Sequence, residues 1–194
     1  MPPERTVLAF DTSGPHVAVA LCDGDVVLAS RCEAMAKGQA ERLMPLIGEV
    51  LAAAERDLQD VTLIAVGIGP GNFTGVRIAV SAARGLALGL DLPAVGVSGL
   101  EAAALDQPRP VTAVLPAPRG QSYVQRFDGG APVMLSQDET PELPVAPTLD
   151  PEALVRNIAR IALRREGPQP RPAPLYLRPA DAAPPKDPAP VLLP

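Results

Sequence analysis

The sequence predicts an α/β protein with a well-formed N-terminal domain at 1–106, a smaller, truncated second domain at 107–182 and a flexible tail at 183–194. Composition is the first observation: 47% of the 194 residues are hydrophobic, which is enough for one good core. Proline is the second, because only six of its 25 copies precede residue 107. The third is the regular alternation of strand-like and helix-like apolar patterns in the first part.

The N-terminal elements follow from hydrophobic period and turn signals. Strands are expected at 6–10, 17–22, 26–32, 63–68 and 94–97. An Asp23-Gly24-Asp25 turn joins the second and third of them as a hairpin. Helices are expected at about 43–54, 76–88 and 98–105. The order β-β-β-α-β-α-β-α is that of a ribonuclease-H-like domain, the building block of actin-like ATPases and sugar kinases.

The second part contains fewer regular patterns. It gives two strands at most, at 111–115 and 122–127. One helix is predicted after Asp150-Pro151-Glu152, which supplies an N-cap, a proline at the first helical position and an early carboxylate. This helix should run to about Arg165, and the proline-rich chain beyond it is expected to be extended or disordered.

Charge and cysteine usage exclude several classes of protein. The net charge of −5 disfavours a protein that binds the phosphate backbone of a nucleic acid over a broad surface. No apolar run approaches the roughly 20 residues of a membrane span, and no signal peptide opens the sequence, so a cytoplasmic location is expected. Cys22 and Cys32 cannot form a disulfide framework. With His16 as the single histidine, no spaced set of metal ligands is present, and no metal is expected.

A glycine-rich loop between a strand and a helix, GIGPGNFTGVR at 67–77, is the most specific motif. A helix N-terminus behind such a loop is a natural anion site, with Thr74 as a fair N-cap. The loop nevertheless fails the dinucleotide pattern, and the Walker lysine is absent. A tight strand-to-helix corner therefore remains an equal alternative. The candidate anion or nucleotide contacts, which include the turn after the first strand, are Asp11, Thr12, Gly71, Asn72, Thr74, Gly75 and Arg77.

The turn Asp11-Thr12-Ser13-Gly14 ends the first strand with a carboxylate and small hydroxyls. In actin-like ATPases a turn of this kind lies beside the γ-phosphate of the nucleotide and its metal ion. Those enzymes also need phosphate and adenosine loops from a second lobe, and no such loops follow residue 107. An aspartate that only caps its own turn is the alternative. Ser13 and His16 could in principle belong to a hydrolytic triad with an aspartate. The sequence shows no nucleophile elbow or oxyanion loop, so a surface or capping histidine is expected.

Two helices are candidates for a partner-binding surface. Glycine costs a helix about 1 kcal/mol relative to alanine, so glycines on one stripe suggest close packing against a neighbour. Packing within the chain is the alternative explanation. The candidate interface residues are Leu43, Leu46, Ile47, Gly48, Val50, Leu51, Ser81, Ala82, Gly85, Leu86 and Gly89.

Several segments together resemble the TsaB (YeaZ) family. They are LAFDTS at 8–13, QAERLMP at 39–45, the loop at 69–77, GVS at 96–98 and PLYLR at 174–178. The resemblance implies a catalytically silent partner of the transferase TsaD in making threonylcarbamoyladenosine beside the anticodon of tRNA. It implies a heterodimer with TsaD, recruitment of the ATPase TsaE, and a homodimer when TsaD is absent. ATP and a metal are then expected in TsaD, and tRNA is contacted only through the complex.

Some residues depart from the family pattern. Gln39 stands where a histidine is common, and Pro116 stands where many members have an aspartate. An arginine stripe at Arg156, Arg160 and Arg164 could touch tRNA or a partner, although a solvated face is the plainer interpretation. Two other functions are weighed against the silent partner. One is a free-standing metalloprotease or glycoprotease, for which one histidine is too few; the other is an independent actin-like ATPase or sugar kinase, which needs the missing second lobe.

Overall fold

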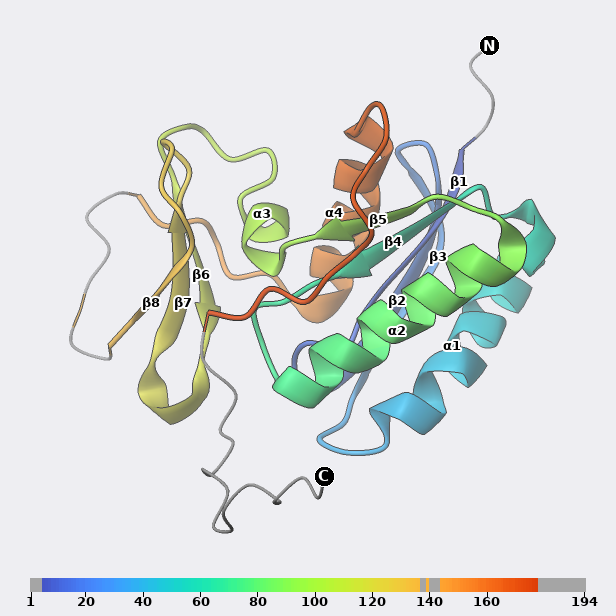
Figure 1. The fold of residues 1–194 in the computed structure, drawn as a ribbon, viewed down its shortest axis with the longest axis horizontal. Coiled ribbons are helices and arrows are strands. Elements are labelled where there is room, and N and C mark those ends of the chain that lie inside the picture. The colour runs from blue at the N-terminus through green and yellow to red at the C-terminus, as the bar shows by residue number, and fades with distance from the viewer. Residues whose placement is uncertain (1–4, 137–138, 140–143, 178–194) are drawn as a thin grey trace, which may run out of the picture.

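The structure is a computed structural model that describes residues 5–136, 139 and 144–177 (Figure 1). Its larger sheet has five strands in the order β3-β2-β1-β4-β5. β1 pairs antiparallel with β2 and parallel with β4, which confirms the ribonuclease-H-like arrangement predicted from the element order. The strands are β1 (Thr6–Asp11), β2 (His16–Asp23), β3 (Val26–Ala34), β4 (Leu63–Gly67) and β5 (Ala94–Val97).

Helices cover both faces of this sheet (Figure 1). α1 (Gln39–Ala53) and α2 (Phe73–Leu90) lie on one face. The short α3 (Gly99–Ala103) and the longer α4 (Pro151–Arg164) belong to the core on the other. Because successive strand residues point to opposite faces, Leu8 and Phe10 of β1 pack toward α1 and α2, whereas Val7 and Ala9 pack toward α4. One sheet therefore separates two apolar cores.

The position of α4 qualifies the predicted domain division. The sequence placed this helix in the second domain, but Val155, Ile158 and Ala159 are buried against the first sheet, in the core that contains Val7 and Ala18. The reason is that β1 and β2 present a second apolar face, which needs a cover as wide as an amphipathic helix. The chain after residue 107 thus returns to complete the N-terminal core. The boundary at 107 itself stays a prediction.

The second sheet holds three strands, β6 (Thr112–Pro116), β7 (Ser122–Arg126) and β8 (Val133–Leu135), in that order and all antiparallel. Two of them were predicted, and the limit of two was wrong. β8 has only three residues, too few for its alternation to register as a strand. Short 3₁₀ turns occupy Leu58–Asp60 and Pro118–Gly120.

Residues 165–177, which we call the strap, cross in front of β4 and β5 after α4 ends (Figure 1). The strap contains no helix or strand, as expected, but hydrogen bonds fix it to the first sheet and to α2. Leu175 N donates to Ile68 O at 2.8 Å, and Arg84 Nε donates to Pro172 O at 2.7 Å. Arg165 Nη1 donates to Gly96 O at 3.1 Å. The predicted tail at 183–194 lies outside the described residues.

Candidate functional site

Two loops meet where the parallel strands β1 and β4 end, and the glycines of one fit against the backbone of the other. A Cβ added at Gly67 would collide with Asp11 Oδ1, one at Gly71 with Ser13 O, and one at Gly75 with Thr12 O. Asn72 N also donates to Ser13 O at 2.7 Å. The glycine spacing is therefore required by loop-on-loop packing, which is the strand-to-helix corner that the sequence left as an alternative.

One oxygen of the Asp11 carboxylate, Oδ2, is engaged within its own turn. This oxygen accepts hydrogen bonds from Ser13 N at 3.1 Å and Ser13 Oγ at 2.9 Å, and lies 2.9 Å from His16 Nε2. Asp11 is 1% exposed and His16 is 8% exposed, so of the two roles expected for His16, surface or capping, the surface one is wrong. Ser13 and His16 each contact the Asp11 carboxylate, and no hydrogen bond joins Ser13 to His16. This is not the arrangement of a hydrolytic triad.

The N-terminus of α2 is capped by its own chain. Asn72 Oδ1 accepts from the amides of Thr74 and Gly75, each at 3.0 Å, so Asn72 is the N-cap and the expectation of Thr74 was wrong. Thr12 Oγ1 donates to Gly75 O at 2.6 Å. The amides that could have held an anion therefore already have an acceptor.

Arg77 points from the first turns of α2 toward the strap. Its Nε donates to the Tyr176 hydroxyl at 2.7 Å, and its guanidinium lies 3.8 Å from the centroid of the Phe73 ring. The two aromatic rings stack with centroids 4.9 Å apart. The structure thus brings the candidate anion contacts together, but it engages Asp11, Asn72 and Arg77 in contacts within the chain.

Gln39 has a positioning role that sequence reasoning did not assign. Its amide is buried at the start of α1, and Nε2 donates to Gly14 O at 2.7 Å and to His16 O at 3.0 Å. A weaker contact reaches Thr12 O at 3.4 Å. One side chain therefore fixes the turn after β1 from the side of α1. Within the described part of the chain, no group of three or more His, Cys, Asp or Glu side chains gathers as metal ligands do.

The surface of α1 and α2 that points away from the sheet is rich in small residues. We call it the outer face, and it consists of Met44, Gly48, Ser81, Gly85, Leu88 and Gly89. Leu88 is 84% exposed and Met44 is 45% exposed. A Cβ added at Gly48, Gly85 or Gly89 would meet no atom of the described residues within 4 Å. Packing within the chain therefore does not account for these glycines.

The larger apolar residues that the sequence assigned to the interface lie elsewhere. They pack against the sheet with at most 5% exposure, so they do not form the outer face; these are Leu43, Leu46, Ile47, Val50 and Leu51. Their stripe is the one apolar face that α1 needs to cover the sheet. Ala82 and Leu86 are half-buried at the margin of the same core. Sequence reasoning missed Met44 and Leu88, whose signal was an apolar side chain outside the core stripe.

α2 is unusually apolar for a helix with so much exposed surface. Its 18 residues have a mean hydropathy of 1.3, and 28% of them are buried. By length and composition alone this helix could cross a membrane, so the expectation that no apolar run approaches such a length was wrong, although a single helix of this kind is weak evidence for a membrane span. Here it lies along the sheet as a helix of an α/β domain does (Figure 1). The outer side of α2 therefore carries small and apolar residues that no other described element covers.

The arginine stripe of α4 is paired within the chain. Arg160 Nη2 lies 2.7 Å from Asp106 Oδ2, and Arg164 Nη1 lies 3.3 Å from Asp106 Oδ1. Arg156 reaches Glu152 at 3.8 Å. The hydrogen bond from Arg160 holds the pKa of the Asp106 carboxyl below its ordinary value. The geometry agrees with a solvated, charge-balanced face.

Known proteins resemble this chain in sequence and in structure. The family model described as "TsaD: tRNA N6-adenosine threonylcarbamoyltransferase" matches residues 32–134. The tRNA threonylcarbamoyladenosine biosynthesis protein TsaB of Escherichia coli is 40% identical over 94 residues, covering 48% of this chain and 40% of that protein. TsaB of Bacillus subtilis is 37% identical over 121 residues, covering 61% and 53%. The chain thus spans about half the length, or less, of these curated relatives.

Two further matches extend over most of the chain. An uncharacterized protein of Mycobacterium tuberculosis is 32% identical over 199 residues, covering 92% of this chain and 94% of that protein. The solved structure of YeaZ from Pseudomonas aeruginosa superposes with a TM-score of 0.70 at 25% identity, covering 89% of this chain and 99% of that one. The similarity therefore includes the second sheet, α4 and the strap as well as the N-terminal part.

Proposed function

The chain belongs to the TsaB (YeaZ) family, and on that premise we propose that it is a non-catalytic partner subunit in the biosynthesis of threonylcarbamoyladenosine on tRNA. In this proposal it binds the transferase TsaD, and TsaE joins the assembly. ATP and metal chemistry belong to TsaD, and tRNA is reached only through the complex. The assembly works in the cytoplasm, and the chain pairs with itself when TsaD is absent.

The outer face of α1 and α2 carries the proposal of pairing. Glycine weakens a helix by about 1 kcal/mol per residue relative to alanine, so a glycine with no neighbour in its own chain needs another explanation. Gly48, Gly85 and Gly89 have open space where a Cβ would stand. A second pair of helices could approach the backbone closely at these positions, and Leu88 and Met44 would lose their exposure there.

The engaged loops support a non-catalytic role. A catalytic carboxylate directs lone pairs at substrate or metal, and one of the two Asp11 oxygens, Oδ2, is already taken up by Ser13 and His16. The Thr74 and Gly75 amides of α2, which could bind a phosphate, already donate to Asn72 Oδ1. Asp11 Oδ2 and these α2 amides would have to break contacts within the chain before they could serve a substrate.

The pairing surface is tested by placing a large charge on the outer face. Gly85→Arg and Gly48→Arg should each abolish pairing with TsaD in size-exclusion chromatography with light scattering, because the added side chain fills the space that the second helix pair needs. Melting followed by circular dichroism should shift little, since both positions are open. Ala131→Arg, in an exposed loop before β8, is the matched control and should pair normally.

Two outcomes of this experiment contradict the assignment. If pairing survives in both variants, the interface lies elsewhere on the molecule. If melting drops sharply together with pairing, the glycines serve the fold of the monomer instead.

A separate reaction tests catalytic silence. The isolated chain, incubated with threonylcarbamoyl adenylate and unmodified tRNA, should form no modified adenosine. Modified adenosine should form when TsaD and TsaE are added together to the same mixture. Product that scales with the concentration of this chain alone would show that it is an enzyme.

A further inference from the structure

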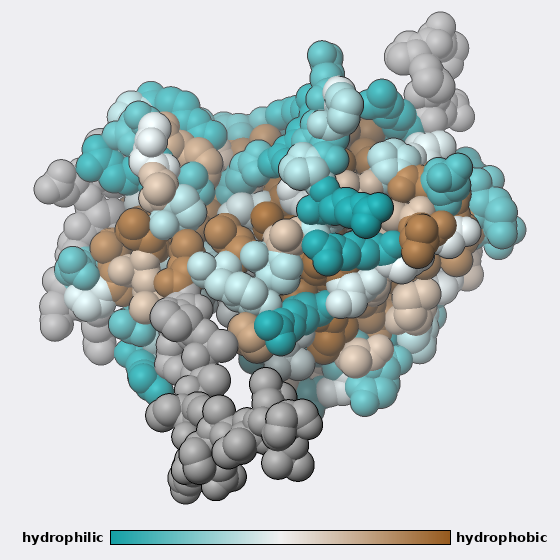
Figure 2. Space-filling view, viewed as in Figure 1, coloured by the Kyte–Doolittle hydropathy of each residue, from teal (hydrophilic) through white to brown (hydrophobic). Residues whose placement is uncertain are grey.

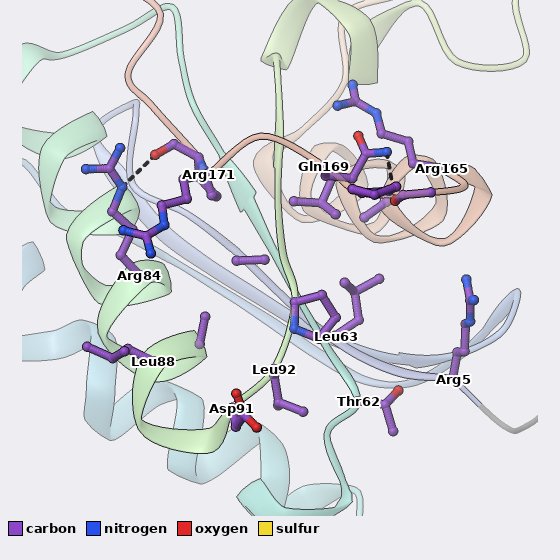
Figure 3. Close-up of a pocket in the computed structure, with 18 residues that line it drawn as sticks. Arg5, Thr62, Leu63, Arg84, Leu88, Asp91, Leu92, Arg165, Gln169 and Arg171 are labelled. Carbon is purple, nitrogen blue, oxygen red and sulfur yellow. Dashed lines mark hydrogen bonds between the residues drawn. The ribbon is translucent and has the colours of Figure 1, made fainter.

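A groove of about 960 Å³ lies between the C-terminal half of α2 and the strap (Figure 3). Its floor is apolar and includes Leu63, Leu92 and Ala94. β5 is the edge strand of the large sheet, and on its outer side no described strand pairs with it, although Arg165 Nη1 donates to Gly96 O there. The groove lies beside the outer face of α1 and α2 and shares only Leu88 with it.

The rim of the groove is basic at both ends. Figure 3 shows Arg84 and Arg171 at one end and Arg5 at the other, with Leu63 and Leu92 between them. Among the described residues, no carboxylate lies within 4.0 Å of these three guanidinium groups. Arg165, on the strap wall, differs because it pairs with Glu101 at 2.7 Å. A chain with a net charge of −5 thus places three arginines that have no described carboxylate partner around a groove in which Asp91 is the one described acidic lining residue.

The walls of the groove are fixed by hydrogen bonds. Arg84 Nε donates to Pro172 O, which holds the strap against α2, and Arg165 Nη1 donates to Gly96 O. Arg84 uses only Nε for this bond. Among the described residues, its two terminal nitrogens have no hydrogen-bond partner and can bind a ligand. Figure 2 shows hydrophilic side chains next to apolar surface where α2 faces the strap. The hydrogen bonds therefore fix the shape of the groove, which has an apolar centre and charged ends.

We propose that this groove binds an extended acidic segment of a protein partner. Apolar side chains of the segment lie on Leu63 and Leu92, its carboxylates meet Arg84 and Arg171 at one end and Arg5 at the other, and its backbone runs beside the edge of β5. Guanidinium forks suit carboxylates in this geometry. Nucleic acid fits less well, because the floor is apolar, Asp91 lines the groove and the whole chain is acidic. The proposal does not depend on pairing through α1 and α2.

The probe is a capped seven-residue peptide with two glutamates at each end and three leucines in the middle. Added to the ¹⁵N-labelled full chain at low salt, it should shift the amide signals of Leu92, Ala94 and Val95. Raising the salt should weaken binding, because the contacts at both ends are between charges. A peptide with lysines in place of the glutamates should not bind.

Two single variants locate the charged ends. Arg171→Ala and Arg5→Ala should each weaken binding of the acidic peptide about two- to fivefold, and together about four- to twenty-five-fold, in the range of exposed charge pairs. Arg126→Ala, on β7 of the second sheet, is the matched control and should leave binding unchanged. Circular dichroism melts of all variants should coincide with that of the parent, because Arg5, Arg126 and Arg171 are exposed.

Three results would overturn the proposal. The first is an acidic peptide that leaves the Ala94 and Val95 signals unmoved at millimolar concentration. The second is binding that survives in the Arg5→Ala, Arg171→Ala double variant. The third is a single-stranded oligonucleotide that binds more tightly than the peptide and loses its affinity in the same variants, which would make the groove a nucleic-acid site.

Discussion

Arg77 Nε donates a hydrogen bond to the hydroxyl of Tyr176 across 2.7 Å, and joins the second turn of α2 to the end of the strap. The same guanidinium lies over the Phe73 ring, and the rings of Phe73 and Tyr176 stack. An arginine in the first turns of a helix is unfavourable to the helix dipole. The aromatic pair compensates for that position, and explains why a cation is tolerated there.

Removal of this guanidinium should loosen the strap more than it unfolds the protein. Arg77→Ala should cost about 1 kcal/mol of unfolding free energy, from one exposed hydrogen bond and one cation–π contact. Proteinase K should then cleave the strap several-fold faster than in the parent. Tyr176→Phe, which keeps the ring stack but loses the acceptor, should show a smaller effect of the same sign. A strap equally resistant in all three proteins would mean that Arg77 does not hold it.

The Asp11 turn should behave as a structural unit. Asp11→Ala leaves the Ser13 amide, the Ser13 hydroxyl and the His16 ring without their buried acceptor, and should cost about 2–3 kcal/mol in urea unfolding. Asp25→Ala, in the exposed hairpin turn, is the control and should change stability by no more than about 0.5 kcal/mol. A stable Asp11→Ala protein that has lost only TsaD-dependent activity would assign the carboxylate to function instead.

Local patterns were sufficient for most of the fold. The hairpin at Gly24, the continuous apolar run of β1 and the Asp150 cap of α4 each depend on neighbours in sequence, so their elements were predicted within a few residues. The Asp150 cap is direct: its Oδ1 accepts from Ala153 N at 2.7 Å. What local patterns do not encode is which sheet an amphipathic helix covers, so the return of α4 to the first sheet was missed.

The candidate site was predicted less well, for the same reason. A glycine spacing permits both a phosphate loop and a tight corner, and only the backbone of the Asp11 turn against Gly71 and Gly75 decides between them. Periodicity marked the apolar stripe of α1 but could not say that Leu46 faces the sheet while Gly48 faces outward. The basic groove joins residues as distant as Arg5 and Arg171, which no sequence window contains.

The Asp106–Arg160 pair should make stability depend on pH at the acid end. Arg160 lowers the pKa of Asp106 in the folded chain below the unfolded value of about 4. The pair therefore stabilises the fold fully above about pH 5, and this contribution is lost as the pH falls through the lower, folded pKa. Asp106→Asn keeps a side chain that tolerates the left-handed backbone (φ 59°) but removes the charge.

The comparison is made by urea unfolding at two pH values. The midpoint of Asp106→Asn should lie below that of the parent at pH 7, and the gap between the two midpoints should narrow in acid, as the parent carboxylate takes up a proton below its lowered pKa. Equal midpoints at pH 7, or a gap that persists unchanged in acid, would show that the pair does not act through this charge.

The two cysteines should differ in reactivity. Cys22 is 1% exposed, and burial raises its pKa to about 11, so only about 0.1% of it is thiolate at pH 8. Iodoacetamide should therefore modify Cys32 first in the folded protein, because Cys32 is only half-buried. Cys22 should react only after denaturant is added. Peptide mass mapping of timed samples checks this order, and early labelling of Cys22 would contradict it.

Gly85 gives opposite expectations for the monomer and for the complex. A methyl group at this helical position meets nothing within 4 Å, so Gly85→Ala should stabilise the isolated chain by about 0.5–1 kcal/mol, through better helix propensity and a less flexible unfolded state. If a second helix approaches the backbone closely here, the same methyl group should weaken pairing with TsaD several-fold. Thermal melts and titration calorimetry measure the two effects. Gly69→Ala, whose backbone has φ 88°, is the control and should destabilise the monomer. A Gly85→Ala chain that is more stable and pairs as well as its parent would remove close backbone approach from the explanation of this stripe.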